Sequence, residues 1–154
     1  MIRLASFLFG VLLLVGCESG IYYQDTYKPE DNVWKHSDLV DFDFFIADST
    51  AMYNMYLDIT HETSYPFQNL YVMIRSVSPD GLIIEDQHSL ELQEKGGAWI
   101  GGCNAQKCEI RFILREGFTF PMSGSYTIQL EQNTRTEALK GVREIGLVIE
   151  KVKS

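Results

Sequence analysis

The dominant pattern of this chain is a two-residue alternation of apolar and polar side chains, which starts near Leu39 and recurs to the C-terminus. Residues 40–46, for example, place valine, phenylalanine and isoleucine on one face and two aspartates on the other. Such alternation predicts β-strands with one buried face. Strands are expected on this basis at residues 40–46, 53–61, 70–77, 82–85, 89–93, 109–114, 118–120, 125–132 and 142–152.

The spacing of these strands indicates the fold class. Turn signals such as Ser78-Pro79-Asp80-Gly81 separate the strands, and only residues 133–139 suggest a helical turn or an irregular excursion. Parallel neighbours need crossovers of a dozen or more residues, for which the chain has no room. About eight or nine strands of this kind predict an all-β, antiparallel β-sandwich, either jelly-roll-like or immunoglobulin-like. A closed barrel is the alternative.

The N-terminus has a different pattern, a single apolar run over residues 4–15 that follows Arg3. A membrane-spanning helix needs roughly 20 apolar residues, so this run is too short and is typical of a signal peptide. It closes with Leu14-Val15-Gly16-Cys17, which resembles a bacterial lipobox. The resemblance implies that Cys17 becomes the first mature residue and anchors the protein in the lipid bilayer through its acyl chains. An ordinary signal peptide with an incidental cysteine is the alternative.

These signals predict a signal peptide at 1–16, a lipidated N-terminus and tether at 17–35, and a single β-sandwich domain at 36–154. The full chain carries a net charge of −8, and removal of Arg3 makes it −9, which argues against nucleic acid as a partner. Glu18 is followed by Ser19-Gly20-Ile21 and not by the acidic run expected of a surface-export signal. We therefore expect a lipid-anchored protein of the cell envelope, on the periplasmic face of the outer membrane.

The chain offers no evident catalytic or metal-binding motif. His36, His61 and His88 lie in separate segments, and none is paired at the spacing of metal ligands. There is no Gly-x-Ser-x-Gly nucleophile elbow and no glycine-rich loop before a helix. Asp41 and Asp43 share one strand face, which is typical of a solvated sandwich surface. The sequence thus predicts a non-enzymatic protein without metal or cofactor.

Two cysteines besides Cys17, Cys103 and Cys108, occur in one short polar segment. Outside the cytoplasm such a pair favours a disulfide that closes a loop tip, and free thiols are the alternative. A metal site would need two further ligands that the neighbourhood does not supply.

Aromatic residues are more numerous than one core requires. Surface aromatics often mark contacts with proteins or sugars, and Tyr65, Phe67 and Trp99 are candidates for such a partner-binding surface. The alternative is that most of these rings pack into the sandwich or its tether. The full set comprises Tyr22, Tyr23, Tyr27, Trp34, Tyr56, Tyr65, Phe67, Tyr71 and Trp99.

Two segments carry a resemblance to a known family, whose pattern reads "YNLYL…YPYSNL". They are Tyr53-Asn54-Met55-Tyr56-Leu57 and Ser64-Tyr65-Pro66-Phe67-Gln68-Asn69-Leu70-Tyr71. Smaller matches occur at Trp34, Trp99-Ile100-Gly101, Phe120-Pro121, Gly124-Ser125-Tyr126-Thr127, Glu131-Gln132 with Arg135, Gly141-Val142-Arg143-Glu144-Ile145-Gly146 and Ile149-Glu150-Lys151. The combination resembles the gliding motility lipoprotein family of Bacteroidota called GldH.

That resemblance implies a lipoprotein needed for gliding over surfaces and linked to the gliding and type IX secretion apparatus, with no catalytic residues. The expected partners are other proteins of the envelope or of that machinery. A carbohydrate- or ligand-binding envelope lipoprotein that uses exposed aromatics is the alternative function. The family typically lacks a cysteine pair at the positions of Cys103 and Cys108, which marks that loop as a local variation.

Overall fold

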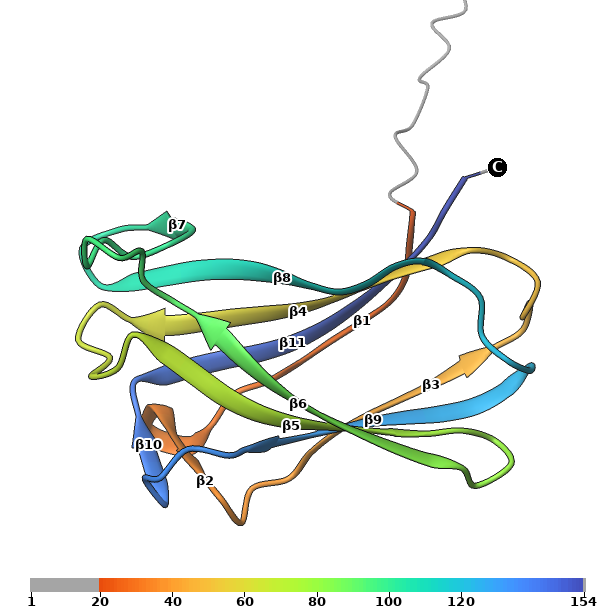
Figure 1. Cartoon of the computed structure of the whole chain (residues 1–154), viewed down its shortest axis with the longest axis horizontal. Coiled ribbons are helices and arrows are strands. Elements are labelled where there is room, and N and C mark those ends of the chain that lie inside the picture. The colour runs from red at the N-terminus through yellow and green to blue at the C-terminus, as the bar shows by residue number, and fades with distance from the viewer. Residues whose placement is uncertain (1–19, 154) are drawn as a thin grey trace, which may run out of the picture.

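The computed structural model describes residues 20–153, which form two facing antiparallel sheets with a core between them (Figure 1). The first sheet has the strand order β1-β11-β4-β8-β7 and the second the order β3-β9-β5-β6. A two-stranded ribbon, β2 with β10, lies at one end of the sandwich. Every strand pair in this part of the chain is antiparallel, as the sequence predicts.

The bounds of the elements follow the chain from the N-terminus. The described elements are β1 (Ile21–Tyr27), η1 (Glu30–Asn32), β2 (Val33–Lys35), β3 (Val40–Ile46), β4 (Tyr53–Glu62), β5 (Asn69–Val77), β6 (Ile83–Glu91), β7 (Gly102–Cys103), β8 (Lys107–Phe118), β9 (Gly124–Gln132), β10 (Ala138–Lys140) and β11 (Val142–Lys151). Within residues 20–153 no helix is long or apolar enough to cross a bilayer.

The alternation read from the sequence builds the core directly. In β3 the valine, phenylalanine and isoleucine positions are buried, and the residues between them are exposed. Asp41 and Asp43 point outward and accept hydrogen bonds from Gln129 and Thr127 of the neighbouring strand β9, at 2.8 and 2.5 Å. These two carboxylates belong to a solvated sheet face, and each is satisfied there.

Some strand boundaries differ from the prediction. The two expected strands at 82–85 and 89–93 are one strand, β6, because an edge strand can carry Asp86 and His88 toward solvent without breaking its pairing. Residues 133–139 do not form a helical turn. They turn and then enter β10, where Leu139 pairs with Trp34 of β2 and both side chains are fully buried.

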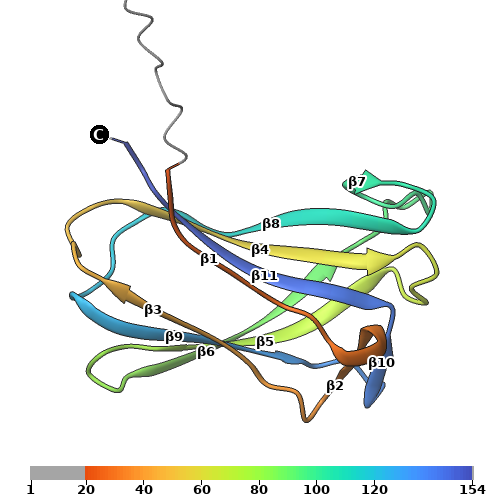
Figure 2. The ribbon, with the colours of Figure 1, turned by 180° about the vertical axis from the view of Figure 1, so that it is seen from behind.

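The N-terminal part of the fold also differs from the expected boundary at residue 36, because β1 and β2 lie within the predicted tether. β1 pairs with β11 along the edge of the first sheet, as Figure 2 shows from behind. The rings of Tyr22 and Tyr23 pack against Tyr53 and Phe44 of the core, which explains why this segment joins the sandwich. Cys17 and the predicted signal peptide lie outside the described residues.

Candidate functional site

The end of the sandwich where β4 finishes gathers four aromatic rings. His61 lies 4.6 Å from Trp99 and 5.6 Å from Tyr65, and Tyr65 lies 5.9 Å from Phe67, measured between ring centroids. The structure thus brings together the three residues predicted as a partner-binding surface. They differ in exposure: Phe67 is 41% exposed, Trp99 is half-buried and Tyr65 is only 4% exposed. Only Phe67 is well placed to touch a partner.

Tyr65 instead holds the loop between β4 and β5. Its hydroxyl donates to the carbonyl oxygen of Asn69 at 3.2 Å, and burial raises its pKa. Gly141 packs beside it with φ of +88°, and a Cβ at that position would lie 3.3 Å from the Tyr65 Cα. A larger residue would meet both backbone strain and the tyrosine, so this close approach favours glycine.

His61 is a fully buried polar residue of this end. Its side chain has no exposed surface, its Nδ1 lies 2.8 Å from the Glu62 carbonyl oxygen, and its Nε2 has no hydrogen-bond partner among residues 20–153. Desolvation by burial lowers the pKa of His61, so the neutral ring is favoured. The carbonyl contact assigns the proton to Nδ1.

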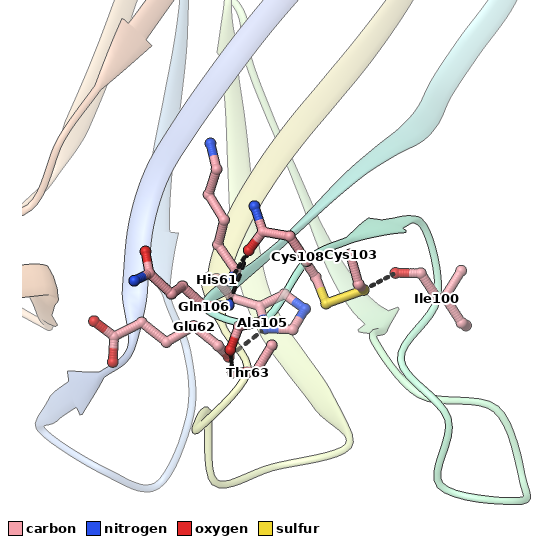
Figure 3. Close-up of a disulfide and its surroundings, with 10 residues drawn as sticks. His61, Glu62, Thr63, Ile100, Cys103, Ala105, Gln106 and Cys108 are labelled. Carbon is pink, nitrogen blue, oxygen red and sulfur yellow. Dashed lines mark hydrogen bonds between the residues drawn. A yellow bond between two sulfur atoms is a disulfide. The ribbon is translucent and has the colours of Figure 1, made fainter.

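A disulfide joins Cys103 and Cys108 beside this histidine (Figure 3). The two cysteines face each other across the β7–β8 hairpin, and Cys108 also pairs in register with His61 on β4. The hairpin tip is tied to the β4–β5 loop, since the Thr63 backbone N–H donates to the Gln106 carbonyl at 3.1 Å. The disulfide therefore shapes a loop that lies against the aromatic end.

The loop from Trp99 into β7 also depends on a special backbone position. Gly101 has φ of +95°, and a Cβ there would lie 2.4 Å from the Glu109 carbonyl oxygen. No side chain fits at that distance, so glycine allows the Trp99 segment to lie against β8.

A groove of about 400 Å³ opens next to Phe67 on the outer face of the second sheet. Phe67 and Tyr71 supply two exposed rings, and Arg135 supplies a guanidinium with no ion-pair or hydrogen-bond partner within residues 20–153. None of the lining residues is acidic, although acidic residues outnumber basic ones by 21 to 13 in the chain. The lining comprises Phe67, Asn69, Tyr71, Gln87, Asn133, Thr134, Arg135 and Thr136.

One buried side chain builds the loop that forms a wall of this groove. Gln132 is 1% exposed, and its Oε1 accepts from the Thr134 hydroxyl at 2.6 Å and from the Thr134 backbone N–H at 3.1 Å. Its Nε2 donates to the carbonyl of Thr136 at 2.9 Å. His36 contacts the Thr134 carbonyl at 2.9 Å from the other side. The wall that carries Arg135 is therefore held in place before any ligand arrives.

The groove joins two parts of the chain that carry the family resemblance, residues 64–71 and the smaller match at residues 131–135. Phe67, Asn69 and Tyr71 come from the former, and Arg135 with its supporting Gln132 comes from the latter. Sequence reasoning named only Phe67 among the lining residues as a site candidate. An arginine in the polar run 133–137 was the available signal, but the proximity of that run to Phe67 arises only in the folded chain.

The remaining aromatics divide between core and surface. Trp34 is fully buried, and its indole Nε1 donates to the Asp38 carbonyl at 2.8 Å. Partly buried rings are Tyr22, Tyr23, Tyr27 and Tyr56, and Tyr71 is 40% exposed.

The three histidines do not converge. His36 lies before β3, and His61 is the last residue but one of β4. His88 lies on β6, where its Nε2 is 3.2 Å from an Asp86 carboxylate oxygen. In the described part of the chain no group of three or more histidine, cysteine, aspartate or glutamate residues could hold a metal ion.

Comparison with known proteins places the sandwich in a family. The sequence model of the GldH lipoprotein family matches residues 21–149, from β1 to the last strand. The chain belongs to this family. A gliding motility lipoprotein GldH and a GldH homolog, from two bacteria, are similar to the chain over nearly their whole length.

The curated relatives have low sequence identity to this chain, but the similarity extends over nearly the whole of each protein. The chain is 27% identical over 150 residues to the gliding motility lipoprotein GldH of Flavobacterium johnsoniae, covering 93% of this chain and 92% of that protein. It is 26% identical over 152 residues to a GldH homolog of Christiangramia forsetii, covering 94% and 93%. The crystal structure of the Yersinia pseudotuberculosis-derived mitogen matches with a TM-score of 0.37 and 7% identity, over 86% of this chain and 88% of that chain.

Proposed function

We propose that this GldH-family chain is a lipid-anchored, non-enzymatic binding module of the gliding motility machinery and its associated type IX secretion apparatus. It acts by contacting other envelope proteins on the periplasmic face of the outer membrane. The observation that carries the proposal is the family match over the whole sandwich, together with relatives named as gliding motility lipoproteins. The dispersed histidines support the non-enzymatic part.

The position of β1 indicates which end of the sandwich a lipid on Cys17 would hold near the membrane. Ile21 begins β1 only four residues after Cys17, and four extended residues span at most about 14 Å. A lipid on Cys17 would therefore hold this end of the sandwich close to the bilayer. β4 runs for 10 residues from Tyr53 at this end to the aromatic end, a length of about 30 Å. The groove would then lie at the end away from the anchor.

The test is genetic complementation in a gliding host that lacks the gene. Wild-type protein should restore gliding and type IX cargo secretion, and Cys17→Ser should leave a protein that no longer fractionates with membranes. Phe67→Ala together with Arg135→Ala should reduce complementation at unchanged protein level. Phe45→Ala is the matched control, because Phe45 is a 60% exposed phenylalanine on β3 outside the groove.

Unchanged gliding and secretion after gene deletion would overturn the role in the machinery. Membrane fractionation of Cys17→Ser at native levels would overturn the lipid anchor. Full complementation by the double groove variant would remove the groove from the proposal and leave the family role in place.

The composition of the groove favours a second candidate, an envelope lipoprotein that binds a carbohydrate. Two exposed rings, three amide side chains and an arginine can stack on a sugar face and hydrogen-bond its hydroxyl or carboxylate groups. Calorimetry with polygalacturonate, and with dextran as the neutral control, tests this function. Binding of polygalacturonate that Arg135→Ala abolishes would support it, and no heat with either polymer would reject it.

A further inference from the structure

Strand β6 is the outermost strand of the second sheet, and one of its two edges faces no other strand among residues 20–153. Figures 1 and 2 show it on the side of the sandwich opposite β1 and β3. It is 9 residues long, and its pairing with β5 shows no register shift. A strand of this length with a continuous free edge is a ready template for another strand.

The hydrogen bonds to the neighbouring segments decide which backbone groups face outward. The Leu92 N–H donates to the Gln68 carbonyl at 2.8 Å, and the Ser78 N–H donates to the Leu82 carbonyl at 2.9 Å. Because bonded positions recur every second residue, the even-numbered residues of β6 face β5. The odd-numbered residues therefore present free N–H and C=O groups to the outside, and they are Ile83, Glu85, Gln87, Ser89 and Glu91.

The other edges of the two larger sheets in residues 20–153 carry features that hinder such pairing, and the strands of the β2–β10 ribbon have only 3 residues each. β1 has a register shift between Ile21 and Tyr23 and is followed by Lys28-Pro29. β7 has only 2 residues, and β8 has register shifts in its pairing with β4. β3 is covered by Tyr22, whose hydroxyl donates to the Phe45 carbonyl at 2.9 Å and accepts from the Ala47 N–H at 3.1 Å. β6 contains neither proline nor lysine.

Apolar surface accompanies the free edge. Leu82, Ile83 and Ile84 are 56%, 56% and 58% exposed. Beside them, an apolar slot of about 240 Å³ opens between the sheets, lined by Ile84 from β6 and by Leu114 and Phe118 from β8. A strand added to β6 would pair with the free backbone and direct alternate side chains into this slot.

The charges of β6 indicate the composition of that strand. β6 carries Glu85 and Glu91 on its outer face and Asp86 on the face of the slot, and it contains no arginine or lysine. Glu85 pairs with Arg75 on β5 at 2.6 Å, and Asp86 lies 3.2 Å from His88 Nε2. An added strand with basic residues opposite Glu85 and Glu91 is favoured, and a second copy of the acidic β6 would oppose its own charge.

We propose that β6 receives an extended segment of another envelope protein as a fifth strand of the second sheet. The segment alternates basic residues, which face Glu85 and Glu91, with apolar residues, which enter the slot beside Ile84. The proposal rests on the proposed function as a binder of envelope proteins and names the kind of partner. It concerns the free edge of β6, and Gln87 is the one β6 residue that also lines the groove at Phe67 and Arg135.

The test uses a defined probe on the mature protein, a peptide of alternating lysine and valine over about nine residues, the length of β6. Its binding should slow amide hydrogen exchange at Glu85, Gln87 and Ser89 by at least about tenfold, because these N–H groups become bonded. The same peptide with glutamate in place of lysine should bind at least about tenfold more weakly. No protection at the three residues, equal binding of both peptides, or a dimer without peptide would each overturn the proposal.

Two variants separate backbone pairing from side-chain contact. Ser89→Pro removes one outward N–H while leaving the β5 ladder intact, and it should abolish peptide binding. Ser89→Ala removes the same side chain but keeps the N–H, and it should bind as the wild type does. If Ser89→Pro fails to fold, the exchange measurement on the wild type still decides.

In cells, a photoreactive residue at position 89 should crosslink the chain to a protein whose contact site is an extended basic segment. Ser89→Ala should glide normally, and Ser89→Pro should not. A gliding defect on gene deletion combined with normal gliding of a folded Ser89→Pro variant would reject the strand-addition proposal and leave the proposed function standing.

Discussion

The two ends of the sandwich both gather aromatic side chains, but they use them differently. At the end where β1 begins, Tyr53 and Phe120 lie 5.2 Å apart between ring centroids and are 0% and 6% exposed. The Tyr53 hydroxyl donates to the Asp48 carbonyl at 2.8 Å. At the opposite end, His61 has an unpartnered Nε2 within the described structure, and Phe67 is 41% exposed.

The two clusters therefore differ in how far they are exposed to solvent. The first cluster closes on itself, since its rings pack edge to face and its polar atoms are satisfied. In the second cluster, side-chain exposure increases from buried His61 and Tyr65 to exposed Phe67. Phe67 also lines the groove that contains Arg135. Stability does not require an exposed ring or an arginine without a partner in residues 20–153, and the proposed binding function would use both.

The largest expected effect comes from opening the closed cluster. Tyr53→Ala removes a fully buried ring, and we expect it to lower the free energy of unfolding by about 3–5 kcal/mol. Urea denaturation of the purified protein measures the loss. A loss below about 1 kcal/mol would show that this end is not the closed core described above.

The disulfide at the open end should contribute less. It closes a short loop with a sequence separation of 5, so its removal by Cys103→Ala with Cys108→Ala should cost about 2 kcal/mol. Urea denaturation of the double variant and of the reduced wild type provides two independent measurements. A cost as large as that of Tyr53→Ala would mean that the disulfide holds the fold and not only the loop.

His61 should make the open end sensitive to acid. Burial lowers its pKa below the ordinary value of 6.5, so the unfolded chain binds the proton more readily than the folded chain. The free energy of unfolding should therefore fall as the pH drops below about 6.5, by at most about 1.4 kcal/mol per pH unit, until the folded pKa is reached. Urea denaturation at pH 7 and pH 5 measures this decrease. His61→Phe should show a smaller decrease, and an identical decrease would contradict the assignment.

The smallest effect on stability should come from Phe67. Because the ring is 41% exposed, Phe67→Ala should lower the free energy of unfolding by no more than about 1 kcal/mol, similar to the control Phe45→Ala. The two variants should differ in function, since only Phe67 lines the groove. Thermal unfolding compares their stabilities, and a gliding assay compares their function. Equal gliding by both variants would place the binding surface elsewhere.

Periodicity alone predicted the sandwich and most of its strands because each strand has one buried face, and a two-residue repeat records burial locally. β3, with its outward Asp41 and Asp43, is the clearest case. The same reasoning placed the domain boundary at residue 36. It missed that β1 completes the first sheet, because the burial of Tyr22 and Tyr23 depends on rings that lie far away in the chain.

The site was predictable only in part. Tyr65, Phe67 and Trp99 were recognised as unusual aromatics, and the folded chain does bring them together. Their exposure could not be read from the sequence, because Tyr65 is covered by Gly141 and by its own loop. Arg135 lay in a stretch without periodicity, so no local pattern connected it to Phe67.

The sequence by itself determined the antiparallel β architecture, the predicted lipidation site at Cys17 and the family. Each of these depends on contiguous residues or on a short repeat. The tertiary structure decided the groove and the free edge of β6. Both depend on which strands become neighbours, and in an antiparallel sandwich that choice is made by contacts between residues distant in the chain. The alternation shows that a strand has a buried face, but it does not show whether another strand will lie beside it.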